Sequence, residues 1–445
     1  MISEILFVLT IITPAVGLAV LGLLLLVNPR ISESLVSNIT RQTIKLSAIF
    51  SMLLLPAVVL HTMGIHIPFL EHFALEGFRL VQVGEYHVNF SFVLHPRETV
   101  FLVLASCITY IIAVFASTYL HREKAFNRFH LLLLVTLFGT TIIATAEGLD
   151  VLMIGWEFLG VASILLIAFY GHRDTPLNNA LSVYRVYRIA DIGMMIGIIL
   201  LHHFAEHAGI HNISELNPEQ INWVMGFIVL GAMGKGAIFP FSYWLPKGME
   251  GPTPSSAVFY GSVSVHLSPL LLLRVMPELH AESHIPWVVI GLGAVTALYG
   301  TILVRVQSDV KASIAFATIT QIGLIWMEIG MGWYNLAIVH IVANAAFRAH
   351  QILRAPSVLQ ERNHVMQSKR ARIEQHSPVW VRVLPTGMRH MLYTMAIERL
   401  YLEELWNNII YMFLSSIQFI NNLEEKWRNI LDGEETSTQP KGEKR

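Results

Sequence analysis

Charged side chains stand inside long apolar stretches of this sequence. Glu157 lies in one apolar run and Lys235 in another, and between them Arg185, Arg188 and Asp191 recur every three residues. That spacing predicts three side chains along one face of a helix. A charge at the centre of a lone membrane helix costs about 2.5–3.5 kcal/mol on insertion scales. Each of these residues therefore requires a structural or functional reason.

Lys235 stands at a predicted helix break. It has glycine on both sides, and Pro240 and Pro246 follow it. Because proline lacks an N–H and clashes with the preceding turn, the helix should end or kink close to Lys235. Broken helices at mid-membrane depth line protein-buried or wet cavities, where transporters bind ions. The sequence thus predicts a proton site at Lys235.

Two interpretations fit these intramembrane charges. Desolvation disfavours a charged lysine and a nearby carboxylate favours it, so a movement of Glu157 between Lys235 and the Arg188–Asp191 pair would switch proton binding. The alternative is a static, neutral network that fixes the helix register. Four charges on three successive spans beside a helix break favour the proton site.

A second polar stripe lies later in the chain. His340, Asn344 and Arg348 follow one another at intervals of four residues, so they share a helix face that we expect to point inward. A histidine suits proton transfer, but a buried histidine is also a common hydrogen-bonded core residue, so both roles stay open. His266 is a further candidate for a gating or relay group. Lys311, at the start of a span, is interpreted as an anchor that reaches water.

The metal-binding potential of the chain is weak. His202, His203, His207 and His211 have spacings that can hold zinc, but we interpret them as solvated loop histidines. The single cysteine, Cys107, lies inside a predicted span and cannot build a thiolate site. We find no phosphate-binding loop, nucleophile elbow or nucleic-acid patch. We therefore expect no metal, no cofactor, no enzymatic activity and no nucleic-acid partner for this chain.

Membrane helices must position all of these residues. The composition is 54% hydrophobic and 14% charged, with a mean hydropathy of +0.56, which is typical of a protein in lipid. Runs of about 20 apolar residues cross roughly 30 Å of hydrocarbon as helices. The predicted fold is an all-α polytopic membrane protein with eleven spans. Their expected ranges are 5–27, 43–63, 98–119, 130–148, 150–170, 179–201, 222–247, 254–275, 286–306, 310–331 and 334–355.

Two segments outside the spans also have a readable pattern. Residues 79–94 alternate about a central Gly84-Glu85, which predicts a short β-hairpin over one membrane face. From about Met388 to Leu431, apolar residues recur at helical spacing among polar ones, which predicts a long amphipathic helix. Its most apolar part, residues 409–420, is too short to cross a bilayer, so it should lie at the membrane surface or against a partner.

Basic residues indicate the orientation of the chain. Lys and Arg gather in alternate loops, whereas the loops at 202–220 and 276–284 have none. The positive-inside rule then places the N-terminus outside and the C-terminus in the cytoplasm of a bacterial inner membrane. We divide the chain into the N-terminal helices with the hairpin (1–129), a first repeat (130–275), a partial second repeat (286–355) and a cytoplasmic tail (356–445).

Several motifs in residues 80–355 resemble the NuoL, NdhF and MrpA family of complex I subunits and cation antiporters. The resemblance implies an antiporter-like fold, and it assigns the family's membrane glutamate, broken-helix lysine and arginine–aspartate pair to Glu157, Lys235, Arg188 and Asp191. The matching motifs are GWEFLG at 155–160, YRIAD at 187–191, GKGA at 234–237, WLPKGMEGPTPSS at 244–256 and QSDVKASIAFATITQIG at 307–323.

The sequence departs from that family at two points. Arg348 replaces the family's lysine on the eleventh helix, and an arginine hardly deprotonates at physiological pH. The chain also shows no clear twelfth and thirteenth spans, so we expect a truncated second repeat.

Within the superfamily, the segment EGPTPSSAVFYGSVSVH at 250–266 resembles DabB, the membrane subunit of two-component inorganic carbon accumulation systems. That resemblance implies a DabA-like cytoplasmic zinc protein as partner, with proton or sodium influx energising the hydration of carbon dioxide. A proton-pumping subunit of a complex I-like or hydrogenase-type complex is the alternative. A non-conducting membrane scaffold is the third possibility.

Overall fold

The computed structural model describes residues 2–64, 73–75, 77, 79–83, 86–205, 207–307, 309–355 and 385–431. The chain forms two compact units, Met1–Arg382 and Val383–Arg445. Within the described residues, ten helical segments are long and apolar enough to cross a membrane. The all-α polytopic fold is therefore confirmed. The finer division of the chain into repeats stays a prediction.

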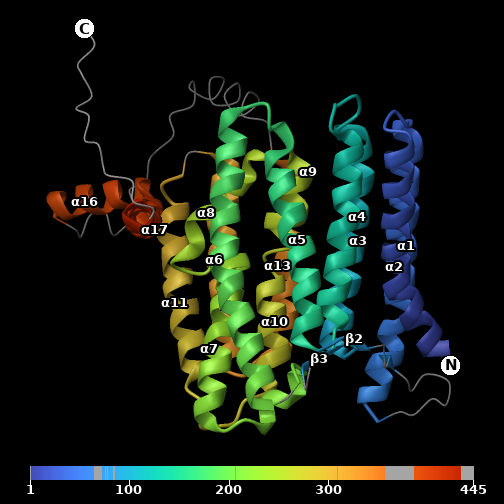
Figure 1. Ribbon diagram of the computed structural model, residues 1–445. Helices are drawn as coiled ribbons and strands as arrows, with labels where there is room; N and C mark the ends of the chain where they lie inside the picture. The colour runs from blue at the N-terminus through green and yellow to red at the C-terminus, as the bar shows by residue number, and fades with distance from the viewer. Residues whose placement is uncertain are drawn as a thin grey trace. The chain divides into compact units, whose positions relative to one another are not determined.

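The first six long helices pack in sequence order. Each contacts the next along the chain, and their axes run side by side in Figure 1. Apolar residues cover most of their surface, as lipid requires of a spanning helix. They are α1 (Ile2–Val27), α2 (Glu33–Thr62), α3 (Pro96–Tyr119), α4 (Phe126–Thr145), α5 (Leu149–Ile167) and α6 (Asp174–Ala205).

The seventh helix breaks where the sequence predicts. α7 (Pro218–Lys235) starts at a capping box formed by Asn217 and Gln220, and it ends at Lys235. Ala237 has a φ of +51°, outside the helical range, and Pro240 has no N–H to donate to the Gly236 carbonyl, so the backbone leaves the helical path after Lys235. Within the predicted span 222–247, the regular helix therefore continues only as far as Lys235. After the break come short helical pieces, at Phe241–Tyr243, α8 (Trp244–Lys247), Gly248–Glu250 and α9 (Thr253–Ser256).

The predicted span 254–275 is also interrupted. After α9 the chain forms a π-helical segment, Ala257–Ser262, and α10 starts only at Leu267 and ends at Val275. Pro269 has no N–H to donate to the Val265 carbonyl, so one regular helical bond is missing at the junction of this segment with α10. Irregular backbone at this depth requires burial within protein, and the most apolar part of this segment is fully buried.

Three further helices complete the first unit. These are α11 (Ile285–Val304), α12 (Val310–Gly330) and α13 (Tyr334–Arg354). α11 packs against α12, α12 packs against α13, and α13 packs against the π-helical segment. The interrupted stretch is thus enclosed by regular helices.

A small strand region lies at one end of the helices (Figure 1). β2 (Arg79–Val83) and β3 (Tyr86–Asn89) pair antiparallel, with Val83 opposite Tyr86, so the predicted hairpin is confirmed. A second pair, β1 (Ala74–Leu75) with β4 (Phe92–Val93), was not predicted. A bridge between Phe92 and Ala146 ties this region to the turn between α4 and α5.

The second unit is helical, as predicted for the tail, but it is not one helix. α16 (Thr386–Ile397) and α17 (Leu402–Leu431) are separated by a turn in which Leu400 has a φ of +57°. This left-handed backbone costs roughly 1–2 kcal/mol for a residue with a side chain, and the helical pattern of the sequence gave no sign of it. α17 carries exposed apolar side chains among its polar ones, as in an amphipathic helix.

Candidate functional site

Four charged residues from three helices form a continuous chain of ion pairs. Arg188 of α6 pairs with Glu157 of α5 and, through Nη2, with Oδ2 of Asp191 at 2.8 Å. The other carboxylate oxygen of Asp191, Oδ1, lies 3.3 Å from Nζ of Lys235, the last residue of α7. We call Glu157, Arg188, Asp191 and Lys235 the charge chain. The structure thus brings together four of the residues that the sequence singled out.

The charge chain runs from the side of the bundle into its core. The side chains of Glu157 and Arg188 are 32% and 35% exposed, whereas those of Asp191 and Lys235 are 3% and 0% exposed. Charges buried in this way persist only when they are paired and hydrogen-bonded. The two inner residues therefore depend on each other more than the two outer ones do.

Two aromatic residues complete the inner pair. Trp156 donates from Nε1 to Oδ1 of Asp191 at 2.8 Å. Nζ of Lys235 lies 4.7 Å from the ring centroids of both Trp156 and Tyr187, within the range of a cation–π interaction. The sequence reasoning missed both residues. A usable signal was that a tryptophan inside an apolar span needs a partner for its indole N–H.

Close packing by glycine makes room for the lysine head group. A Cβ atom at Gly160 of α5 would lie 3.3 Å from Nζ of Lys235, and one at Gly234 would collide with Ala190 of α6. Glycine at these positions therefore lets α5 and α6 approach the end of α7.

Arg185 is not part of the charge chain, which corrects the sequence prediction. It is exposed on α6 and forms no ion pair within the described part of the chain. A step of three residues turns an α-helix by about 300°, so two such steps from Asp191 rotate the side chain by about 120°. Arg188 stays within reach of Asp191, but Arg185 lies on another face.

A tryptophan closes the break after Lys235. Trp244 of α8 donates from Nε1 to the Gly234 carbonyl oxygen at 2.8 Å, which satisfies a carbonyl at the end of α7. On the other side, a Cβ atom at Gly236 would collide with Oγ of Ser268 in α10. Ser268 is fully buried and its hydroxyl has no hydrogen-bond partner among the described residues.

A second buried polar cluster starts two residues before Ser268. His266 is fully buried, and its Nδ1 hydrogen-bonds to the carbonyl oxygen of Ser262. Nδ2 of Asn344 in α13 lies 3.0 Å from Nε2 of His266, and Nε of Arg348 donates to Oδ1 of Asn344 at 3.3 Å. Arg348 also donates to Oε1 of Gln351 at 2.6 Å. His266 and Arg348 thus belong to one hydrogen-bonded chain.

His340 lies outside that chain. Its Nδ1 is 2.8 Å from Oε1 of Glu328, and its Nε2 is 2.8 Å from Oε1 of Gln321, both on α12. The stripe of His340, Asn344 and Arg348 therefore divides between two sets of partners. Sequence reasoning missed Glu328, although an acidic residue in an apolar span was a signal.

The structure corrects the loop assignment of two histidines in the candidate zinc cluster, because His202 and His203 both lie on α6. His203 is exposed, whereas His202 is buried with Nε2 3.7 Å from Oδ2 of Asp150. Among the described residues, no group of three or more histidine, cysteine or acidic side chains could hold a metal ion.

The fold and the buried charges define a multi-pass membrane protein whose core holds ionisable groups. Residues 146–389 match the family described as NADH:quinone oxidoreductase/Mrp antiporter, transmembrane. Residues 80–130 match the N-terminal region of complex I chain 5. The chain belongs to the NADH:quinone oxidoreductase/Mrp antiporter family. The resemblance drawn from the motifs is confirmed at the level of this family.

Curated relatives share about a third of the aligned residues. The chain is 33% identical to NADH-ubiquinone oxidoreductase chain 5 of Balaenoptera physalus over 70% of its own length and 50% of the whale protein. It is 32% identical to the Sus scrofa chain 5 over 62% of its own length and 46% of that protein. The chain thus spans about half the length of the curated relatives it matches.

Two solved structures share the fold. The membrane-bound sulfane sulfur reductase, an archaeal respiratory membrane complex, contains a chain that aligns with a TM-score of 0.65 and 16% identity, covering 78% of this chain and 70% of that one. A chain of the Mrp complex from Dietzia sp. aligns with a TM-score of 0.65 and 21% identity, covering 76% and 37%. Both support the antiporter-like fold.

Proposed function

We propose that this chain translocates protons as a membrane subunit of a larger complex, and that the charge chain is its switching site. The observation that carries the proposal is the fully buried Lys235, whose Nζ lies 3.3 Å from Oδ1 of Asp191 at the end of a broken helix. A buried amine keeps its proton only while a carboxylate faces it. The protonation of the Lys235 amine therefore depends on the positions of Asp191 and its partners.

Arg188 is the residue that can change this balance. It contacts both Glu157 and Asp191, so the two carboxylates compete for one guanidinium. When Arg188 turns toward Glu157, the whole charge of Asp191 is available to Lys235, and the ammonium is stabilised. When Arg188 turns toward Asp191, that stabilisation weakens and Lys235 can release its proton. Arg188 itself keeps its charge throughout.

Ser268 offers a route from Lys235 to the second cluster. Its unpartnered hydroxyl lies beside Gly236, next to Lys235, and two residues from His266. A buried hydroxyl without a protein partner is a position at which proteins hold water. A proton leaving Lys235 would pass through Ser268 and water to His266. Arg348 cannot accept it, because a guanidinium hardly deprotonates, so Arg348 holds Asn344 in place.

The surroundings of Glu157, at the more exposed end of the charge chain, support a role as one subunit of a larger complex. Glu157 and Asp150 are the two charged residues that line a cavity of about 630 Å³, whose other walls are apolar side chains of α4 and α5. Leaving a carboxylate–guanidinium pair against hydrocarbon is costly, so we propose that a neighbouring subunit covers this face.

Proton flux into vesicles that contain the purified protein tests the proposal. Lys235→Met should lower the flux about a hundredfold or more, the lower end of the range for losing one proton-transfer group. The matched control is Lys124→Met, which removes an exposed lysine. Equal flux in the wild type and Lys235→Met would overturn the proposal and support the scaffold alternative.

For the partner, our first proposal is a DabA-like cytoplasmic zinc protein, with the chain in a bacterial inner membrane and its C-terminus in the cytoplasm. The segment at 250–266 supports an inorganic carbon role, and the ion would be H⁺ or Na⁺. The redox alternative is supported by the likeness to complex I chain 5 and to a respiratory membrane complex.

Purification in mild detergent distinguishes these partners. A bound soluble zinc protein, together with uptake of labelled inorganic carbon that a protonophore abolishes, supports the carbon role. A bound quinone-reducing or hydrogenase module would overturn that role and support the redox alternative.

A further inference from the structure

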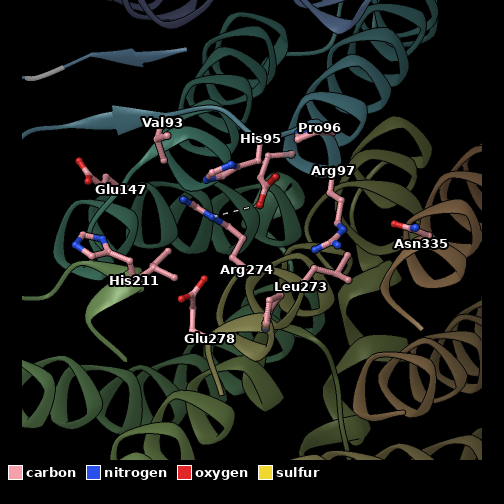
Figure 2. A pocket seen from close by; sticks show the side chains of 13 residues that line it. Val93, His95, Pro96, Arg97, Glu147, His211, Leu273, Arg274, Glu278 and Asn335 are labelled. Atoms are coloured by element: carbon pink, nitrogen blue, oxygen red, sulfur yellow. Dashed lines mark ion pairs between the residues drawn. The ribbon is translucent and has the colours of Figure 1, made fainter. Parts of the chain in front are cut away.

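A charged cavity lies apart from the charge chain, at the N-terminal end of α3. It has a volume of about 670 Å³, and α3, the turn after α4 and the C-terminal end of α10 contribute to its walls (Figure 2). The lining combines both signs of charge with imidazole rings. Its ionisable side chains include Arg97, Glu98, Glu147, Arg274 and Glu278.

Glu98 and Arg274 form the buried part of this cavity. Their side chains are 6% and 3% exposed, and Oε1 of Glu98 lies 3.7 Å from Nε of Arg274. The guanidinium also donates to the carbonyl oxygens of Ile143 and Ala146 at the C-terminal end of α4. Arg274 is therefore held by the backbone and cannot rotate freely to serve both oxygens of Glu98.

The second carboxylate oxygen of Glu98, Oε2, is buried and has no hydrogen-bond partner among the described residues. Burying a carboxylate oxygen without a hydrogen bond is unfavourable, so this oxygen must either bind water or carry a proton. A polar cavity of this size has ample room for water beside it.

We propose that this cavity is a water-filled vestibule and that Glu98 is its proton-exchanging residue. A hydronium ion in the vestibule transfers its proton to Oε2, which leaves a water molecule and a neutral carboxyl group, and the reverse step releases the proton. Arg274 holds Oε1 and keeps Oε2 turned to the water. The role of the vestibule as one end of the proton route rests on the proposed function.

The position of Arg274 connects the vestibule with the interior. Arg274 follows His266 by eight residues along the same buried segment, which is about 12 Å of α-helix. Besides Glu98 and Arg274, the ionisable side chains that line the cavity are Arg97 on α3, Glu147 after α4 and Glu278 after α10, together with the imidazoles of His95 and His211. A short water chain between Glu98 and His266 would join the vestibule to the second cluster.

Thiol labelling tests whether water fills the vestibule. In a Cys107→Ser background, Leu273→Cys places a thiol on the cavity wall, at a position that is only 1% exposed. A small, charged, membrane-impermeant thiol reagent should modify it. The matched control is Leu298→Cys. Leu298 is 65% exposed but lies on the spanning helix α11, so the same reagent should not modify a thiol there. Labelling of the control alone, or of neither thiol, would overturn the vestibule.

Infrared spectra and proton flux test Glu98 itself. Acidification of the wild type should produce a neutral carboxyl band that shifts in heavy water, and Glu98→Gln should not produce that band. Glu98→Gln should lower the flux about a hundredfold or more, Glu98→Asp should retain part of it, and the exposed control Glu219→Gln should keep all of it. Full flux in Glu98→Gln, or the absence of an exchangeable band, would overturn the role of Glu98.

The two proposals fail in different ways. If the wild type carries no proton flux, the proposed function fails, and the vestibule is then decided by the labelling and the infrared band.

Discussion

Asp191 and Lys235 are both buried, with 3.3 Å between the carboxylate Oδ1 and the ammonium Nζ. Glu157 and Arg188 extend this pair to four alternating charges whose sum is zero. Release of a proton from Lys235 leaves one uncompensated negative charge in the core. Because such a charge is costly in a low-dielectric interior, it draws the next proton in, and the chain returns to neutrality.

Asp191→Asn should stop proton flux and destabilise the protein. The change leaves Lys235 without its carboxylate, and breaking a buried ion pair typically costs about 3–5 kcal/mol. The double variant Asp191→Asn with Lys235→Met should recover much of that stability and still carry no flux. Thermal unfolding in detergent and vesicle flux measure both effects. A double variant that is less stable than the single one would contradict this account.

Gly160→Ala should displace the ammonium group of Lys235. The added Cβ would lie 3.3 Å from Nζ, which is closer than the amine can tolerate without shifting. We expect flux to fall several-fold while the protein stays folded. Gly226→Ala is the matched control, because a Cβ there meets nothing within 4 Å, and replacing a helical glycine stabilises a helix by about 0.5–1 kcal/mol. Equal flux in the two variants would speak against tight packing at Lys235.

Trp156→Phe separates two contributions of one side chain. The phenyl ring retains an aromatic face near Lys235, but Asp191 loses the indole N–H that it accepts at 2.8 Å. Losing a hydrogen bond to a charged group costs about 1.5–3 kcal/mol, so flux and thermal stability should both decrease. Trp287→Phe, at a position that is 74% exposed, should change neither. A Trp156→Phe protein with wild-type stability would show that this bond is dispensable.

Glu157→Gln and Arg185→Gln should differ sharply in proton flux. Glu157 competes with Asp191 for Arg188, so its neutral amide should hold Arg188 on Asp191 and slow the switch. Arg185 is exposed on another face of α6, so its replacement should leave the flux unchanged. Flux measured side by side in vesicles decides between them. Loss of flux in Arg185→Gln would return that residue to the proton route.

The sequence predicted the charge chain because isolated charges in apolar runs are rare and because motif positions reinforced them. Glu157, Arg188, Asp191 and Lys235 all fall where the reasoning placed them. The prediction for Arg185 was wrong because the regular spacing of three residues was taken to indicate a shared helix face. Successive steps of three residues instead rotate around the helix. Trp156 and Tyr187 escaped notice because aromatic residues are ordinary in membrane spans.

The parts of the fold that depend on hydropathy could be predicted from the sequence. The parts that depend on single backbone hydrogen bonds were less predictable. Spanning helices follow from apolar length, and the break at Lys235 follows from Pro240. The interruption before Leu267 was missed although Pro269 carries the same signal, because the whole segment is apolar and reads as one span. The cavity at Glu98 lies where α3 and α10 meet. These helices are far apart in the sequence, so a local sequence pattern cannot reveal their contact.

The indole of Trp244 joins the two sides of the interruption in the seventh helix, since it bonds to the Gly234 carbonyl from beyond the break. Such a hydrogen bond contributes about 0.5–1.5 kcal/mol, so it restrains the junction between α7 and α8. Any rocking of α7 against α8 would first have to sever this bond. A change of the Arg188 rotamer leaves this bond intact, so gating at Lys235 can proceed without a movement of whole helices.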